Sequence, residues 1–153
     1  STMTGSANSY GLYLDGASSN TIAQSFAGGQ SGGRLDNSRY NLIDRSTMTG
    51  TYGGGLFLNS ASSNTITQSY FYSPEVYGLY LGQSHDNVIT NSVMLGGSNA
   101  TSLTYQVGAY LYNANDNTIT SSILSDTNDC GADLGQGVCG AGLYAAQSKG
   151  LSL

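Results

Sequence analysis

One block of residues recurs along the whole chain, and this repetition limits the folds available more than any other feature of the sequence. Each copy begins with Gly, carries Asn nine positions later and ends with Ser five positions after that Asn. The full copies are Gly11–Ser25, Gly32–Ser46, Gly55–Ser69, Gly78–Ser92 and Gly108–Ser122, and a sixth begins at Gly142. Because differences in length fall only between copies, each copy is predicted to form one unit that stacks on the next.

Within each copy the apolar residues alternate, which predicts strands and excludes an amphipathic helix. Leu12 and Leu14 share one face, Ala17 stands at a corner, and Ile22 and Ala27 follow as inward residues. In later copies the slot of Ala27 is filled by Met48, Phe71, Met94 and Leu124. Strands this short cannot bury a face alone, but stacking about 4.8 Å apart gives each coil a hydrogen-bonded neighbour on both sides.

Two polar columns are expected to have structural roles. The first contains the aligning asparagines Asn20, Asn41, Asn64, Asn87 and Asn117. We expect each to adopt a left-handed turn conformation and to hydrogen-bond to the amide one coil away. The second is a column of serines predicted to form a small hydrogen-bonding corner: Ser1, Ser25, Ser46, Ser69, Ser92 and Ser122.

The repeated pattern G-L-Y-L-x(5)-N-T-I-T resembles the repeats of right-handed parallel β-helix proteins. This group includes pectate-lyase-like enzymes, phage tailspikes and the periplasmic protein of copper insertion into nitrous oxide reductase. The resemblance implies an all-β fold, a right-handed parallel β-helix of five full coils and a partial sixth, as one domain over residues 1–153. Both ends fall within a coil, without a recognisable cap, so we expect a fragment of a longer protein.

Charge narrows the range of partners. The formal net charge is −5, and only four residues are Lys or Arg. A chain with so few cations is not expected to bind nucleic acid or an anionic membrane surface. No apolar run is long enough for a membrane span. Members of the β-helix group commonly act on or bind polysaccharides, so the resemblance makes a polysaccharide or cell-surface glycan the leading partner class.

Two insertions interrupt the regular spacing, at about residues 96–107 and 125–141. The second contains Cys130 and Cys139, whose spacing does not match a zinc site and favours a disulfide loop. A disulfide would place the chain outside the cell, on its surface or in the periplasm. The alternative is two unpaired thiols in a reducing compartment.

An outward column of aromatic residues, interrupted once by arginine, is the main candidate binding surface. It contains Tyr13, Arg34, Phe57, Tyr80, Tyr110 and Tyr144. Aromatic faces stack on the apolar face of a pyranose ring, so this column is typical of sugar binding. Two alternatives remain: the rings stabilise the sheet by pairing with one another, or they contact another subunit.

Two pairs of carboxylates are the only catalytic candidates, Asp15 with Asp36 and Asp86 with Asp116. Glycoside hydrolysis needs two carboxylates, and neighbouring like charges favour a bound cation or a raised pKa. The simpler interpretation is solvated turn residues. We therefore predict no catalytic residue, no metal site and no cofactor, with calcium kept as a candidate because Asp126, Asp129 and Asp133 lie close together in the sequence.

Other polar groups support no specific chemistry. The second copy contains a cluster of charged residues: Arg34, Asp36, Arg39, Asp44 and Arg45. The cluster indicates either a binding patch for an acidic sugar or surface ion pairs. The single histidine, His85, is interpreted as a solvated turn residue. Outward T-x-T pairs at Thr65/Thr67 and Thr118/Thr120 resemble ice-binding β-solenoids, but the intervening copies break the array.

The sequence therefore favours a secreted or cell-surface module for glycan or cell-surface recognition and scaffolding, similar to an adhesin. A polysaccharide lyase or glycoside hydrolase is the competing class, and a structural fibre segment is the third. We lean towards a non-enzyme, because the carboxylate pairs do not by themselves predict one cleft. A chain of this kind can form homo-oligomers or fibres, and its sequence does not decide between them.

Overall fold

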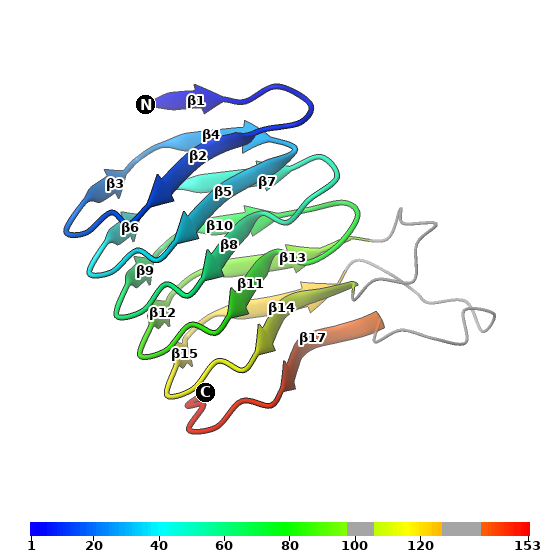
Figure 1. Cartoon of the computed structure of the whole chain (residues 1–153). Coiled ribbons are helices and arrows are strands. Elements are labelled where there is room, and N and C mark those ends of the chain that lie inside the picture. Colours follow the sequence, from blue (N-terminus) through cyan, green and yellow to red (C-terminus); the bar gives the residue numbers. More distant parts are fainter. Residues whose placement is uncertain (98–105, 127–138) are drawn as a thin grey trace.

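The computed structural model describes residues 1–97, 106–126 and 139–153, and all regular structure in these ranges is β-strand. The strands form three parallel sheets, and the chain visits the sheets in turn as it winds (Figure 1). Every third strand therefore belongs to the same sheet. These observations confirm the predicted all-β parallel solenoid.

The first two sheets have six strands each. Sheet 1 contains β1 (Thr2–Thr4), β4 (Phe26–Gly29), β7 (Thr47–Gly50), β10 (Tyr70–Tyr72), β13 (Val93–Gly96) and β16 (Ile123–Asp126). Sheet 2 contains β2 (Tyr10–Asp15), β5 (Ser31–Asp36), β8 (Leu56–Asn59), β11 (Leu79–Gly82), β14 (Gln106–Tyr112) and β17 (Cys139–Ala146). Sheet 3 has five strands, β3 (Thr21–Ala23), β6 (Leu42–Asp44), β9 (Thr65–Thr67), β12 (Val88–Thr90) and β15 (Thr118–Thr120).

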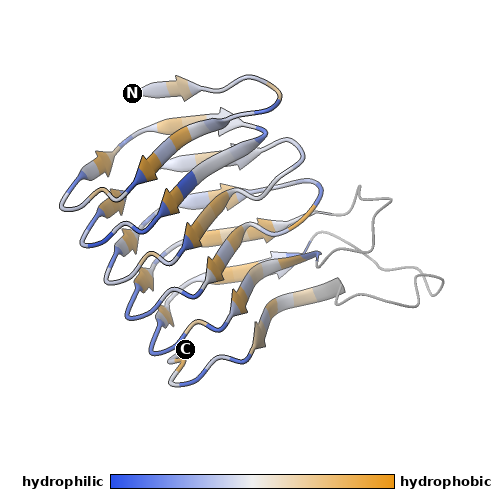
Figure 2. Cartoon of the chain, viewed as in Figure 1, coloured by the Kyte–Doolittle hydropathy of each residue, from blue (hydrophilic) through white to orange (hydrophobic). Residues whose placement is uncertain are grey.

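The strand register reproduces the alignment of the copies. In sheet 3 one isoleucine of each coil pairs with the next, in the order Ile22, Ile43, Ile66, Ile89 and Ile119. The predicted slot of Ala27 does the same in sheet 1, where Met48, Phe71 and Met94 are fully buried. Hydrophobic residues line the inside of all three sheets, and hydrophilic residues gather at the turns (Figure 2). The interior is thus a set of apolar stacks that run along the axis of the helix.

The asparagine column forms a continuous ladder. The Nδ2 group of each Asn donates to Oδ1 of the Asn one coil further on, at 3.0 to 3.1 Å from Asn20 through to Asn117. The same Oδ1 also accepts the backbone N–H of the preceding Asn, at 2.9 to 3.0 Å. In the sixth copy the corresponding slot holds Leu151, which packs against the core. The ladder therefore ends at Asn117.

The predicted left-handed conformation of these asparagines is wrong. The residue before each Asn has the positive φ instead: Ser19, Tyr40, Ser63, Asp86 and Asp116, at 55° to 59°. The Asn follows this turn, and its side chain is free to point along the axis towards the next Asn. A single left-handed residue rotates the chain at each corner, so the bonding residue need not carry the strained conformation.

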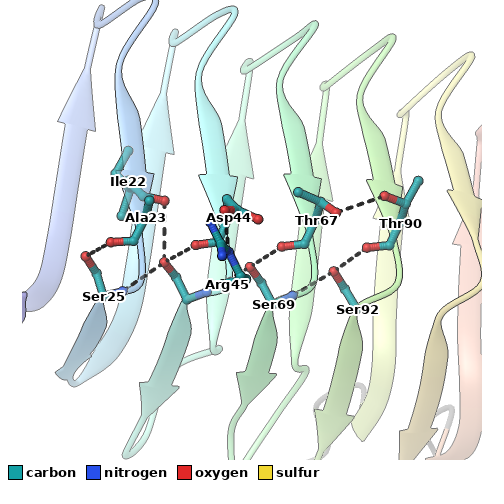
Figure 3. Close-up of polar contacts among 10 residues, drawn as sticks. Ile22, Ala23, Ser25, Asp44, Arg45, Thr67, Ser69, Thr90 and Ser92 are labelled. Atoms are coloured by element: carbon teal, nitrogen blue, oxygen red, sulfur yellow. Dashed lines mark hydrogen bonds and ion pairs between the residues drawn. The ribbon is translucent and has the colours of Figure 1, made fainter.

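The serine column also forms a ladder, as predicted (Figure 3). Ser46 Oγ accepts the N–H of Ser25 at 3.2 Å, and Ser69 and Ser92 repeat this contact at 3.1 Å. Each hydroxyl donates to the carbonyl two residues before it, for example Ser92 to Thr90 at 2.8 Å. The corner donors and acceptors are therefore satisfied within the protein, partly by the same coil and partly by the neighbouring one.

The third corner, which begins with Ala17, alternates between alanine and serine. The order along the axis is Ala17, Ser38, Ala61, Ser84, Ala114 and Ser148. Each serine hydroxyl accepts the N–H of the preceding alanine at 3.0 to 3.1 Å. The next alanine has no hydroxyl to offer in return, so this ladder is complete only at every second step.

Candidate recognition surface on sheet 2

The predicted aromatic column lies in register on the outer side of sheet 2. Tyr13 pairs with Arg34, Arg34 with Phe57, and the pairing continues through Tyr80 and Tyr110 to Tyr144. The ring centroids of neighbouring coils are 5.7 Å apart for Phe57 and Tyr80, 5.4 Å for Tyr80 and Tyr110, and 5.2 Å for Tyr110 and Tyr144. The rings therefore form an unbroken row over four coils.

Tyr77 lies at the centre of this row, although the alignment of the copies did not select it. Its ring centroid is 5.2 Å from that of Tyr80, 5.3 Å from Phe57 and 6.0 Å from Tyr110. The ring lies over Gly54 of the preceding coil, where an added Cβ would be 2.9 Å from Tyr77 Cδ2. Gly54 therefore leaves the space that Tyr77 fills. The sequence signal was a tyrosine directly before the repeat glycine, as at Tyr10.

Burial within this cluster favours the neutral form of two phenols. Desolvation raises the pKa of Tyr77 well above its ordinary value of 10.0, and the neighbouring phenols of Tyr80 and Tyr110 add to the effect. Burial also raises the pKa of Tyr80. Both groups therefore stay neutral across the physiological range and act as hydrogen-bonding phenols on an aromatic surface.

Arg34 changes the chemistry at the N-terminal end of the column. Its Nε donates to both carboxylate oxygens of Asp36, at 2.8 and 2.9 Å. Its Nη1 donates to the Tyr10 hydroxyl at 3.1 Å, and its guanidinium carbon lies 5.5 Å from the Tyr10 ring centroid. Tyr13 donates to Asp36 at 3.1 Å, and this bond is the first cause of its raised pKa. The charge of Arg34 is thus balanced within the chain.

The rings are not coplanar. Neighbouring rings are inclined by 55° for Phe57 and Tyr80, 66° for Tyr80 and Tyr110, and 43° for Tyr110 and Tyr144. Tilted and edge-to-face contacts are the arrangements that aromatic pairs prefer, so the rings stabilise one another. The partly exposed row still presents aromatic edges and faces in a line parallel to the axis.

The carboxylate pairs lie where the sequence placed them, but neither forms a larger acidic group. Asp15 pairs in register with Asp36, which is 7% exposed and already bonded to Arg34 and Tyr13. Asp86 and Asp116 occupy equivalent left-handed turn positions on adjacent coils. Among the described residues, no three His, Cys, Asp or Glu side chains lie close enough together to hold a metal ion.

Comparison with known families assigns the fold. A family described as a right handed beta helix region matches residues 1–147. The chain belongs to this right-handed β-helix family. The match confirms the resemblance drawn from the repeats and fixes the handedness of the coil. No curated protein gives a significant match. Because a fold of this kind supports many functions, the function has to be argued from the surface.

His85 of this β-helix has a structural contact. Its Nδ1 accepts the backbone N–H of Asn115, one coil away, at 2.9 Å. Nδ1 is therefore unprotonated in this arrangement, and the imidazole bridges two turns. The histidine is a turn residue, as the sequence predicted, but it also contributes to the contact between coils.

The charged residues of the second copy do not converge on one patch. The Arg34–Asp36 pair lies on sheet 2, whereas Asp44 belongs to β6 of sheet 3 and pairs with the adjacent Arg45 at 2.8 Å (Figure 3). The two pairs therefore lie on different sheets. This arrangement fits the interpretation as separate surface ion pairs, each of small energetic effect.

The threonine array is interrupted, as the sequence indicated. Thr67 and Thr90 form one contact between coils, with Thr90 Oγ1 donating to Thr67 Oγ1 at 3.3 Å (Figure 3). Val88 separates Thr65 from Thr118, and Asp44 interrupts the second column. The outer face of sheet 3 is therefore not a regular threonine lattice.

Most of the two insertions lies outside the described residues. Cys130, Asp129 and Asp133 fall there, and the side chain of Cys139 is not described. The predicted Cys130–Cys139 disulfide therefore stays a prediction. No helix in the described ranges is long and apolar enough to cross a membrane.

Proposed function

We propose that this β-helix is a secreted, periplasmic or cell-surface module that recognises a polysaccharide or cell-surface glycan through the aromatic column of sheet 2. The observation that carries the proposal is the unbroken row of rings from Phe57 to Tyr144, thickened by Tyr77. Such rings offer apolar surface to the C–H faces of sugars, and their phenols offer hydrogen bonds to sugar hydroxyls.

The spacing of the row supports an extended ligand. The ring centroids of adjacent coils are 5.2 to 5.7 Å apart. A sugar chain that runs along the axis, across the strands, meets a new ring at each coil. Contacts repeated in this way give useful affinity even where each single contact is weak. The rigid sheet also holds the rings in place before the ligand arrives, which reduces the entropy lost on binding.

The charges of the column favour a neutral ligand over an acidic one. The guanidinium of Arg34 is occupied by Asp36 and Tyr10, so it does not stand free for a sugar carboxylate. The remaining members of the column are neutral. We therefore expect neutral polysaccharides to bind at least as well as acidic ones.

The test is a binding and cleavage assay on immobilised neutral and acidic polysaccharides, with and without calcium. We expect retention without cleavage, and weaker retention for Tyr80→Ala. The matched control is Tyr70→Ala, because Tyr70 is also a partly buried strand tyrosine with a pKa raised by burial but lies on sheet 1. Absence of retention, or equal loss in both variants, would contradict recognition through this column.

Cleavage would favour the competing function, a polysaccharide lyase or glycoside hydrolase. The adjacent carboxylates of Asp15 and Asp36 are the observation that keeps this alternative. In that case Asp15→Asn and Asp36→Asn should remove cleavage and leave retention intact. Loss of retention with unchanged cleavage would place the chemistry elsewhere.

The proposed location has a separate test. A secreted or periplasmic chain should contain the Cys130–Cys139 disulfide. We expect no thiol to react in the unfolded, unreduced protein purified from an oxidising compartment. Two reactive thiols per chain would contradict the disulfide and remove its support for that location.

A further inference from the structure

A hollow on the outer face of sheet 1 is separate from the aromatic column of sheet 2. It is a shallow, open hollow lined by β4, by the segment that follows β1 and by the segment that follows β7. Its lining includes Thr4, Phe26, Gly28, Thr49, Thr51 and Tyr52. The hollow has a volume of about 500 Å³, within the range of roughly 300 to 1,000 Å³ that is usual for small-ligand sites.

Gly28 creates the floor of this hollow. Its register neighbours in sheet 1 are Thr4 on one side and Thr49 on the other. The column therefore lacks one side chain between two threonines. The Phe26 ring leans into part of this gap, with Cε1 and Cζ each 3.0 Å from the position that a Cβ on Gly28 would occupy. The floor is thus a glycine backbone beside an aromatic ring that is 38% exposed.

Hydroxyl groups surround this aromatic floor. Thr4 and Thr49 make no side-chain hydrogen bond with any residue in the described ranges, so their hydroxyls are open to a ligand. Thr51 Oγ1 donates to Gly29 O at 3.1 Å and keeps its lone pairs as acceptors. Tyr52, 66% exposed, adds a second ring and a phenol at the rim. No lining residue is charged.

The backbone hydrogen-bonding groups of β4 are already paired within sheet 1. Strand β4 pairs with β1 on one edge and with β7 on the other. An extended peptide cannot add to it as a new strand, so recognition depends on side chains. Rings combined with neutral hydroxyls match a pyranose, which has C–H groups on its faces and hydroxyls at its edges.

We propose that this hollow binds one neutral pyranose unit, as a second saccharide site on a different sheet from the aromatic column. The ring of the sugar lies against Phe26 and Tyr52, and its hydroxyls bond to those of Thr4 and Thr49. The site does not depend on the function proposed for sheet 2, because the two surfaces share no residue.

The test uses the 153-residue chain and methyl glycosides of glucose, galactose, mannose and N-acetylglucosamine. Saturation-transfer NMR measures contact with the C–H groups of the sugar, and titration gives Kd. We expect at least one glycoside to bind with a Kd in the millimolar range and to show transfer to its ring protons. No transfer to any of the four would overturn the proposal, as would binding of only an aromatic peptide or a detergent.

Two variants test the site itself. Tyr52→Ala removes the exposed ring, and Gly28→Thr fills the gap with the residue that its register neighbours carry. Each is expected to raise Kd at least tenfold. Because Gly28 has no positive φ, the backbone accepts a side chain, and the added Cβ needs a shift of the Phe26 ring. Thermal unfolding of Gly28→Thr shows whether the fold is kept, and Tyr52→Ala gives an independent result if it is not.

The control for exposure is Tyr40→Ala, because Tyr40 is 65% exposed but lies outside the hollow. This variant is expected to leave the Kd of the glycoside unchanged. Tyr80→Ala, which removes a ring of the aromatic column, separates binding on sheet 2 from binding in the hollow. Equal weakening by Tyr40→Ala and Tyr52→Ala, or an unchanged Kd in both Tyr52→Ala and Gly28→Thr, would overturn the assignment. Loss in Tyr80→Ala alone would place the sugar on sheet 2 and overturn it too.

Discussion

The asparagine corner and the outer face of sheet 2 are both columns built by stacking, but they leave different groups for a ligand. At the corner, an inner amide accepts from the preceding copy and donates to the next, and Asn41, Asn64, Asn87 and Asn117 are at most 1% exposed. On sheet 2, the rings contact one another and remain partly exposed. Identical polar residues satisfy each other, whereas the variable outward residues retain surface for other molecules. The asparagine corner thus contributes mainly to stability, whereas the outer face of sheet 2 keeps surface for recognition.

The strongest test of this difference is Asn64→Ala in the middle of the ladder. The change removes the bonds from Asn64 Nδ2 to Ser38 O and Asn87 Oδ1, and it leaves both N–H donors of Asn41 without Asn64 Oδ1. We expect a loss of about 3 to 5 kcal/mol in the free energy of unfolding, because buried groups become unsatisfied. Urea denaturation measures it.

Asn20→Ala is the matched control, because Asn20 is an exposed residue at one end of the same ladder. Its loss should be about 1 kcal/mol, since water can replace the missing bonds. Equal losses at the two positions would show that burial of the ladder does not determine its contribution.

Within the aromatic face, Tyr77 and Tyr80 should differ. Each ring contacts three others, but Tyr77 fills the space over Gly54 and is the more desolvated of the two phenols. We expect Tyr77→Ala to lower the free energy of unfolding by about 2 kcal/mol, and Tyr80→Ala by about 1 kcal/mol. A larger loss for Tyr80→Ala would contradict the central position of Tyr77.

The phenol of Tyr77 also predicts a dependence on alkaline pH. Its pKa is raised in the folded state from an ordinary value of 10.0. The stabilisation is therefore complete below pH 10 and is lost as the pH rises above it, because only the unfolded chain readily releases the proton. The loss attributable to Tyr77 is about 1.4 kcal/mol for each pH unit above 10, until the pH reaches the folded pKa.

Tyr77→Phe should remove this part of the pH dependence. The measurement is denaturant unfolding of both proteins between pH 8 and about pH 11.5. The control is Tyr40→Phe, which removes a phenol from a side chain that is 65% exposed. If the free energy of unfolding changes with pH in the same way in the unsubstituted chain and in Tyr77→Phe, burial of this phenol does not couple its ionisation to stability.

The smallest expected effect is a gain at the alternating alanine and serine corner. The N–H of Ser38 has no hydrogen-bond partner within the described residues, and the next member of its column is Ala61. Ala61→Ser places a hydroxyl where the other serines of the column accept such a donor. We expect about 1 kcal/mol of added stability by thermal or urea unfolding. The control, Ser84→Ala, removes an existing acceptor and should destabilise by a similar amount.

The fold and the members of the columns could be predicted because the interactions repeat at a fixed place in each copy. The period of the apolar residues identified the strands, and the recurrence of Asn and Ser identified the ladders. The conformation of the asparagine was predicted wrongly because the sequence preference of one residue type does not show which of two neighbours turns the chain. The side chain needed for the ladder and the left-handed backbone are assigned to successive residues.

The candidate sites could be predicted only in part, because they depend on contacts that are not repeated. Tyr77 enters the aromatic row through the space left by Gly54, a relation between two particular coils. The hollow on sheet 1 similarly arises where Gly28 interrupts a threonine column. An alignment of copies averages out these single differences, although they shape the surface.

The asparagine ladder has a consequence for how such a chain can change over time. The contact from Asn20 to Asn41 spans 21 residues and the contact from Asn87 to Asn117 spans 30, yet both amide bonds are 3.0 to 3.1 Å long. The bond geometry is therefore independent of the length of chain between the two corners. New segments can be accepted between coils while the frame is preserved, so the molecule is suited to displaying foreign peptides as well as to evolving new loops.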